Sequence, residues 1–150
     1  GGSLETKKNK SPTFLVWAMA DAQGTNLQRV QIIKGWLDNG ESKEKVFDAT
    51  CSDGLEVDKS SHRCPDNGAK VNLNDCSISK NKGSRELKTL WKDPEFIEDQ
   101  EAFYYVRVLE NPVCRWSTWD SIRSNQLPRS DIKSTIQERA WSSPIWITNY

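Results

Sequence analysis

Histidine is almost absent from this sequence. His62 is the only one among 150 residues, so a catalytic or metal site that needs two histidines is excluded. No G-x-S-x-G, Walker loop or H-E-x-x-H motif occurs either. His62 lies beside Cys64 in a polar loop, where a solvated side chain is favoured over a metal ligand. We therefore expect no enzyme activity, no catalytic residue, no cofactor and no metal site.

Net charge and long hydrophobic runs are also missing. Twenty-one Lys and Arg residues balance 21 Asp and Glu residues, so no overall positive field exists to attract nucleic acid or a membrane surface. The longest apolar run, residues 14–20, is far shorter than the ~20 residues of a membrane helix. We expect neither a nucleic-acid nor a membrane partner.

The length of the chain suits one domain. A chain of this size buries about two-thirds of the surface that its unfolded form exposes. Residues 1–11 are polar and rich in lysine, which predicts a flexible arm. Its Gly-Gly-Ser start resembles an expression scar. We expect a single β-sandwich domain over residues 12–150.

Four cysteines could stabilise the most polar part of the chain. Residues 52–84 are rich in Asp, Asn, Ser and Gly, and a loop of this length is functional or poorly ordered unless it is fixed. Disulfides are favoured over free thiols or a zinc site, because neither C-x-x-C nor a histidine pair is present. Three pairings are open. The candidates are Cys51, Cys64, Cys76 and Cys114.

The apolar pattern predicts an all-β fold. Residues 13–20 are apolar at nearly every position, which is typical of a central strand buried on both faces. No regular alternation of strand and helix follows, so a mainly antiparallel sandwich is favoured over a parallel α/β fold. The other predicted elements are strands over residues 27–37, 86–91, 103–109 and 138–147, a helical turn over 93–98 capped by Asp93, and a short helix over 118–124.

Asn39 and Gly40 are typical of a β-hairpin loop. A two-residue loop would place Lys34 opposite Lys45. A three-residue loop with a bulge at Gly40 would instead place Lys34 opposite Glu44. Because like charges are unfavourable when they lie directly opposite each other, we predict the bulged loop.

Tryptophan is abundant, with seven residues. Trp17 and Trp146 fall on apolar strands and are predicted to lie in the core. The other candidates combine indole rings with charged neighbours, which favours a cation–π brace over a surface that binds a glycan or small molecule. These candidate binding residues are Arg115, Trp116, Trp119, Glu138, Arg139 and Trp141.

Charges also occur within strands that are otherwise apolar. They are Arg107, Glu110, Glu138 and Arg139. Because an isolated buried ion costs several kcal/mol, we predict structural pairs between arginine and carboxylate among them.

Five segments carry a family resemblance: RVQIIKGW (29–36), WKDPEF (91–96), FYYVRVLE (103–110), CRWST (114–118) and TIQERAWSSPIW (135–146). Together they resemble the C-terminal part of a bacterial family catalogued as domain of unknown function 3604. The resemblance implies longer, hydrolase-like proteins, whose N-terminal part is similar to metal-dependent phosphoesterases and amidohydrolases. That part carries the His and Asp ligands, so the implied activity does not transfer to this chain. Family members commonly look exported, which favours disulfides and a periplasmic or secreted location.

Three functional hypotheses follow. The leading one is a non-catalytic accessory domain that covers apolar strand surface by forming a homo-oligomer or by packing on a hydrolase-like domain. The second is a module that binds a glycan or small molecule through Trp and Arg. In the third, the domain lends Arg115 or Glu138 to a hydrolase active site on another chain.

Overall fold

The computed structural model describes residues 1–5 and 10–148. In this part of the chain, strands predominate and one helix is present. The elements are β1 (Gly2–Glu5), β2 (Thr13–Met19), β3 (Leu27–Asp38), β4 (Glu41–Cys51), β5 (Glu86–Lys92), β6 (Ala102–Glu110), β7 (Val113–Cys114), α1 (Trp116–Arg123), β8 (Thr135–Ile136), β9 (Arg139–Trp141) and β10 (Ile145–Thr148). This arrangement confirms the all-β prediction.

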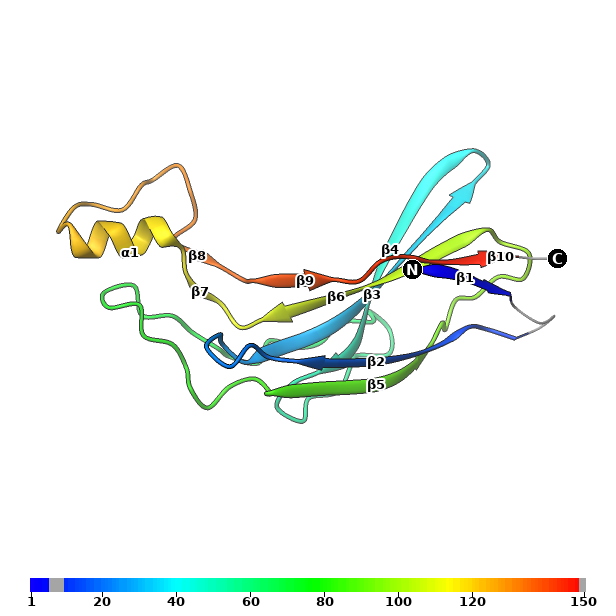
Figure 1. Cartoon of the computed structure of the whole chain (residues 1–150), viewed down its shortest axis with the longest axis horizontal. Coiled ribbons are helices and arrows are strands. Elements are labelled where there is room, and N and C mark those ends of the chain that lie inside the picture. Colours follow the sequence, from blue (N-terminus) through cyan, green and yellow to red (C-terminus); the bar gives the residue numbers. More distant parts are fainter. Residues whose placement is uncertain (6–9, 149–150) are drawn as a thin grey trace.

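Two sheets of unequal size form the sandwich. The large sheet has the order β1-β10-β6-β3-β4, with β9 also paired to β6. The small sheet contains β2 and β5 and forms the second layer (Figure 1). A β7–β8 ribbon leads to α1, which stands apart at one end of the molecule (Figure 1). The predicted strands over 86–91 and 103–109 and the predicted short helix thus exist.

The core lies between the two sheets. In both sheets alternate residues point inward, as the two-residue period of a strand requires. Aromatic rings fill the centre: the Phe47 and Trp91 centroids are 5.4 Å apart, and those of Phe14 and Tyr104 are 5.0 Å apart. The buried members of the core are Val16, Leu27, Val30, Ile32, Phe47, Leu87, Trp91, Ala102, Tyr104 and Ile147.

Two disulfides fix residues 52–84, which confirms the disulfide prediction. Cys51 is bonded to Cys64, and Cys76 to Cys114. The second bond attaches the middle of the long segment to β7. Such bonds are typical of proteins in an oxidising compartment. No described helix is long and apolar enough to cross a membrane.

The predicted burial of residues 13–20 on both faces is wrong. β2 pairs with β5 alone among the described residues, and only its inward side chains, such as Val16, are buried. Trp17 is 67% exposed, so its predicted place in the core is also wrong. The physical reason is the size of the small sheet, whose outer face has no described layer above it.

The predicted bulged hairpin is wrong as well. Asp38 pairs with Glu41 and Lys34 pairs with Lys45, which leaves a two-residue loop. Asn39 and Gly40 have φ values of 51° and 82°, as a type I′ turn requires.

The two opposed lysines are neutralised from outside the hairpin. Lys34 Nζ lies 2.8 Å from Asp93 Oδ2, and Lys45 Nζ donates to Glu95 Oε2 at 2.6 Å. Both carboxylates lie far from the hairpin in the sequence, so the neighbours across the hairpin do not predict them.

The predicted helical turn over residues 93–98 does not form. Asp93 Oδ1 accepts a hydrogen bond from Glu95 N at 2.8 Å, but the chain then continues as turns and not as a helix. The other Asp93 oxygen accepts the Tyr104 hydroxyl at 2.6 Å. Asp93 therefore pins this segment to the large sheet.

The predicted closing strand is divided in two. β9 and β10 both pair with β6, but residues 142–144 interrupt them, and Pro144 has no N–H to donate. β10 contributes Ile147 to the core, while Trp146 is 52% exposed and lies against Phe103, with centroids 5.0 Å apart. The predicted core position of Trp146 is therefore wrong.

Part of the predicted flexible arm is ordered. Gly2–Glu5 form β1, which pairs in parallel with β10. This corrects the prediction for these residues, since the free edge of β10 offers them hydrogen bonds. Residues 6–9 of the arm lie outside the described residues.

Candidate binding surface on the small sheet

The outer face of the small sheet exposes a row of large apolar side chains. Leu15, Trp17 and Met19 of β2 are 74%, 67% and 73% exposed, and Leu90 of β5 is 72% exposed. Leu15 lies directly opposite Leu90 in the β2–β5 register. We call these four residues the outer face.

The sequence of β2 explains this surface. Phe14, Val16 and Ala18 point into the sandwich and pack on the core, so the odd-numbered residues must point outward. β5 is polar at its outward positions, except at Leu90. Lys88 Nζ lies 3.2 Å from Glu86 Oε1, and this pair borders the apolar row.

A groove of about 500 Å³ lies beside this face, between β2 of the small sheet and β9 of the large sheet. Val106 and Val108 of β6 line its inner side, where they continue the core. The groove is thus the open edge of the sandwich. Its full lining is Leu15, Val16, Trp17, Ala18, Met19, Leu27, Val106, Val108, Glu110, Glu138, Arg139, Ala140, Trp141 and Ser142.

One end of the groove is acidic. Glu110 and Glu138 line it, and a Cβ placed on Gly24 would lie 3.1 Å from Glu110 Oε1. Burial raises the pKa of Glu110, and the nearby carboxylates of Glu138 and Asp21 raise it further. A backbone hydrogen bond from Thr25 partly opposes these effects. The carboxylate of Glu110 is therefore held in an environment that disfavours its charge.

Comparison with known proteins places the chain in a family. The sequence matches, over residues 1–149, the family described as Protein of unknown function (DUF3604). The chain belongs to the DUF3604 family. Neither the curated proteins nor the solved structures yield a match to it. The DUF3604 match includes the Gly-Gly-Ser start, which resembles an expression scar.

The groove of this DUF3604 chain brings together half of the predicted binding residues. Glu138, Arg139 and Trp141 all line it, and Trp141 is 58% exposed. Arg139 and Trp141 belong to β9, and Glu138 immediately precedes it.

The other three predicted residues lie elsewhere in the DUF3604 fold. Trp116 and Trp119 belong to α1, and Arg115 Nε donates to Lys133 O at 3.1 Å. A cation–π contact does occur on α1, but it involves an arginine that was not predicted: the Arg123 guanidinium lies 5.3 Å from the Trp119 ring centroid. Because β7–β8 leads α1 away from the sandwich (Figure 1), this helix does not contribute to the groove lining given above.

The predicted pairing of the four strand charges is wrong for the described residues. Arg107 Nε donates to Gln31 Oε1 at 2.7 Å, and the ion pairs of the described chain include none of Arg107, Glu110, Glu138 and Arg139. A neutral amide takes the place of the expected carboxylate.

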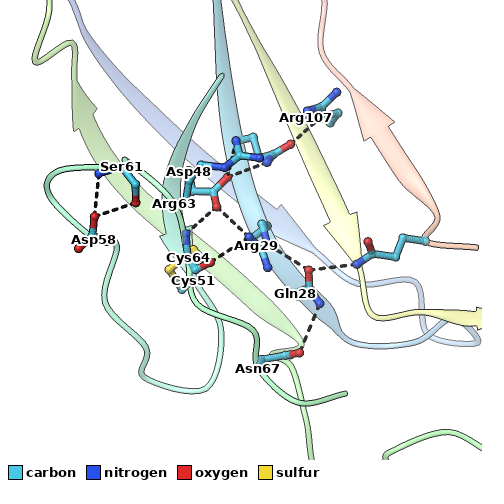
Figure 2. A network of polar contacts seen from close by, with 12 residues as sticks. Gln28, Arg29, Asp48, Cys51, Asp58, Ser61, Arg63, Cys64, Asn67 and Arg107 are labelled. Carbon is cyan, nitrogen blue, oxygen red and sulfur yellow. Dashed lines mark hydrogen bonds and ion pairs between the residues drawn. A yellow bond between two sulfur atoms is a disulfide. The ribbon is translucent and has the colours of Figure 1, made fainter. Parts of the chain in front are cut away.

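A buried ion pair forms instead between Arg29 and Asp48. This fully buried carboxylate lies 2.9 Å from Arg29 Nη1 and accepts hydrogen bonds from Gln31 Nε2 at 2.6 Å and Cys64 N at 2.7 Å (Figure 2). Figure 2 shows these contacts beside the Cys51–Cys64 bond. Every oxygen of Asp48 is thus used to fix the long segment against β4, so we interpret this network as structural.

His62 belongs to the same segment and is not simply solvated. Its Nε2 lies 3.3 Å from Glu95 Oε1, and its ring packs edge-on against Phe47 with centroids 5.2 Å apart. Within residues 1–5 and 10–148, no group of three His, Cys, Asp or Glu side chains could hold a metal ion.

A second cavity, of about 720 Å³, lies on the large sheet and was missed by the sequence analysis. It is lined in part by Gly35, Leu37, Phe103 and Trp146. A Cβ on Gly35 would lie only 2.3 Å from the Phe103 ring, so the ring occupies the space of the missing side chain. The isolated glycine within a strand was the available signal.

Proposed function

We propose that this chain is a non-catalytic β-sandwich domain that binds another protein through the outer face. The observation that carries the proposal is the row of four large apolar side chains, each about 70% exposed. Soluble monomers rarely leave a large contiguous apolar patch uncovered. Burying such surface yields about 25 cal/mol per Å², which makes this face the strongest candidate for association.

The proposed partner is a hydrolase-like domain of the same family. The resemblance described above supports this choice, because it implies longer proteins in which the two parts occur together. A second copy of the chain is the other candidate. In either case, the two disulfides support a periplasmic or extracellular location.

The test is the binding of the chain to a separately produced hydrolase-like region of a longer family member, measured by calorimetry. The double variant Leu15→Ser, Leu90→Ser should bind at least about tenfold more weakly, because each buried Leu contributes roughly 1.5–3 kcal/mol and about 1.4 kcal/mol is tenfold. Leu127→Ser is the matched control, since Leu127 is 93% exposed and lies after α1.

Two outcomes would contradict the proposal. One is equal binding by the double variant and the wild type. The other is the absence of any binding to the hydrolase-like region, together with a monomer in sedimentation velocity at every concentration. A concentration-dependent dimer that the double variant abolishes would instead assign the outer face to a second copy.

A second candidate function is the binding of a glycan or small molecule in the groove. It is favoured by Trp141, whose exposed indole lines the groove together with Arg139 and Glu138. An indole face can stack on a sugar ring while the charged groups meet its hydroxyls. A panel of saccharides should quench tryptophan fluorescence in the wild type but not in Trp141→Ala, whereas Trp116→Ala should bind normally. A silent panel would remove this candidate.

A further inference from the structure

The β2 strand lacks every feature that normally protects a free strand edge. Natural edges carry charges, proline or bulges, or are short or covered. β2 is seven residues long and contains no charged residue, proline or glycine. Yet among the described residues it pairs only with β5.

The two outermost edges of the large sheet are protected. The hairpin end of β4 carries alternating Lys and Glu, and further along Asp48 N donates to His62 O at 2.9 Å, so the long segment covers this part. β1, at the opposite edge of the large sheet, has only four residues and ends in Glu5. The contrast between these protected edges and the unprotected β2 edge indicates that a strand of another chain pairs with β2.

Backbone hydrogen bonds show which groups of β2 are available. Ala20 N donates to Arg85 O and Asp93 N to Pro12 O, so the even-numbered residues of β2 bond to β5. In an antiparallel pair the intervening residues direct their N–H and C=O away from the partner. Leu15, Trp17 and Met19 therefore aim these groups at the free edge.

The same argument applies across the groove. Ser142 N donates to Val106 O, and Glu110 N donates to Glu138 O. Arg139 and Trp141, between these positions, therefore aim their backbone groups away from β6. Two strands with free edges thus border the groove.

We propose that the free edge of β2 binds an extended segment of a partner chain as an added strand. The segment carries apolar side chains at alternate positions, which enter the groove, and a Lys or Arg at the end beside Glu110 and Glu138. This inference deepens the proposed function, and rests on it, because it states how the partner engages the surface around the outer face.

The side-chain pattern of the segment follows from the groove. Val106, Val108 and Glu110 alternate along β6 and face the same side. An added strand in the small sheet would point every second side chain at this row. Two apolar residues would meet the valines, and the residue next in phase would meet Glu110.

Charge complementarity selects the basic residue and argues against a second copy of β2. Two carboxylates and one cation, Arg139, line the groove. The Glu110 carboxylate is partly desolvated and lies near Glu138 and Asp21. The charge of Arg85 offsets these effects only in part, so a partner cation would be favourable. The sequence of β2 has no basic residue. Pairing two copies of β2 would also leave both outer faces exposed.

The probe is a synthetic peptide, acetyl-Lys-Thr-Val-Thr-Val-Thr-Val-amide, together with the version in reverse order, since the orientation is open. The readout is amide hydrogen exchange of the intact wild-type chain by NMR. Either peptide should slow exchange of the Leu15, Trp17 and Met19 amides by about tenfold or more. The Val16 and Ala18 amides should be protected already, because they bond to β5.

Three matched controls isolate the features of the proposal. A peptide that is N-methylated at alternate residues should not protect these amides, and replacing its Lys by Glu should weaken binding about tenfold or more. Trp17→Pro removes the N–H aimed at the edge, so it should bind the peptide less well than Trp17→Ala, which removes only the side chain.

The proposal fails if neither peptide slows exchange at the three amides, or if the N-methylated peptide slows it equally. The proposed function is judged separately by the Leu15→Ser, Leu90→Ser variant. If that variant weakens partner binding while the amides stay unprotected, docking stands and strand addition is wrong. If the amides become protected while the variant binds its partner normally, the added strand stands and the outer face is not the docking site.

Discussion

At the scale of single residues, Glu110 is a carboxylate with no ion-pair partner among the described residues, in a groove whose inner side is apolar. Buried charges elsewhere in the fold are paired. Lys34 meets Asp93, and Arg29 meets Asp48. Each of these pairs offsets the cost of removing its charges from water. Within the described residues, Glu110 thus differs from these two carboxylates in having no ion pair.

The pH dependence of stability tests this account of Glu110. The folded chain holds the Glu110 proton more tightly than the unfolded chain does, because burial raises its pKa. Stability should therefore fall as the pH rises from the ordinary glutamate range through the raised pKa. Glu110→Gln should remove this loss and be more stable than the wild type at neutral pH, as measured by urea unfolding followed by tryptophan fluorescence.

Glu56→Gln, which changes an exposed glutamate in the long segment, is the control and should leave the pH profile unchanged. A Glu110→Gln variant that is less stable at neutral pH would show that the carboxylate is favourably paired after all.

Predictions about single residues failed where they depended on contacts between distant segments, which cannot be read from the sequence. Lys34 and Lys45 do repel each other, but the carboxylates that neutralise them, Asp93 and Glu95, come from a different part of the chain. The pairing of Arg107 failed for the same reason, because Gln31 lies opposite it and relays to Asp48. In both cases the partner is a residue that is distant in the sequence but close in the folded structure.

At the scale of elements, the sequence located most strands because their apolar and β-branched content is strong. It could not assign the place of β2. A strand that is apolar on both faces reads as buried on both, and here the second layer is missing from the described chain. That error concerns the same outer row of apolar side chains that the proposed partner would cover.

The two disulfides offer a prediction at the same scale. Cys51–Cys64 has a sequence separation of 13 and Cys76–Cys114 one of 38. Because loop-closure entropy grows with the logarithm of loop length, removing the longer link should cost about 1 kcal/mol more. Paired Cys→Ser variants and urea unfolding would measure the difference. A larger cost for the shorter link would show that strain or contacts around Asp48 outweigh the entropy.

At the scale of the whole molecule, the fold is a sandwich whose second layer is too small for its first. The large sheet is closed at its edges by β1 and by the charged β4 hairpin, whereas the small sheet has two strands and an unprotected edge. This asymmetry could not be predicted from the sequence, because it depends on which strands pair. The predicted candidates Glu138, Arg139 and Trp141 line one groove, whereas the outer face was not predicted.

The central claim is that another protein covers the outer face, and oxidation of Met19 tests it most directly. Met19 is the only methionine and is 73% exposed. Mass spectrometry can therefore assign any methionine sulfoxide in the chain to this residue. Hydroxyl-radical footprinting should oxidise Met19 rapidly in the free chain and slowly in the complex with the hydrolase-like region, while Trp116 on α1 reacts equally in both. Equal oxidation of Met19 in the free and bound chain would contradict the account.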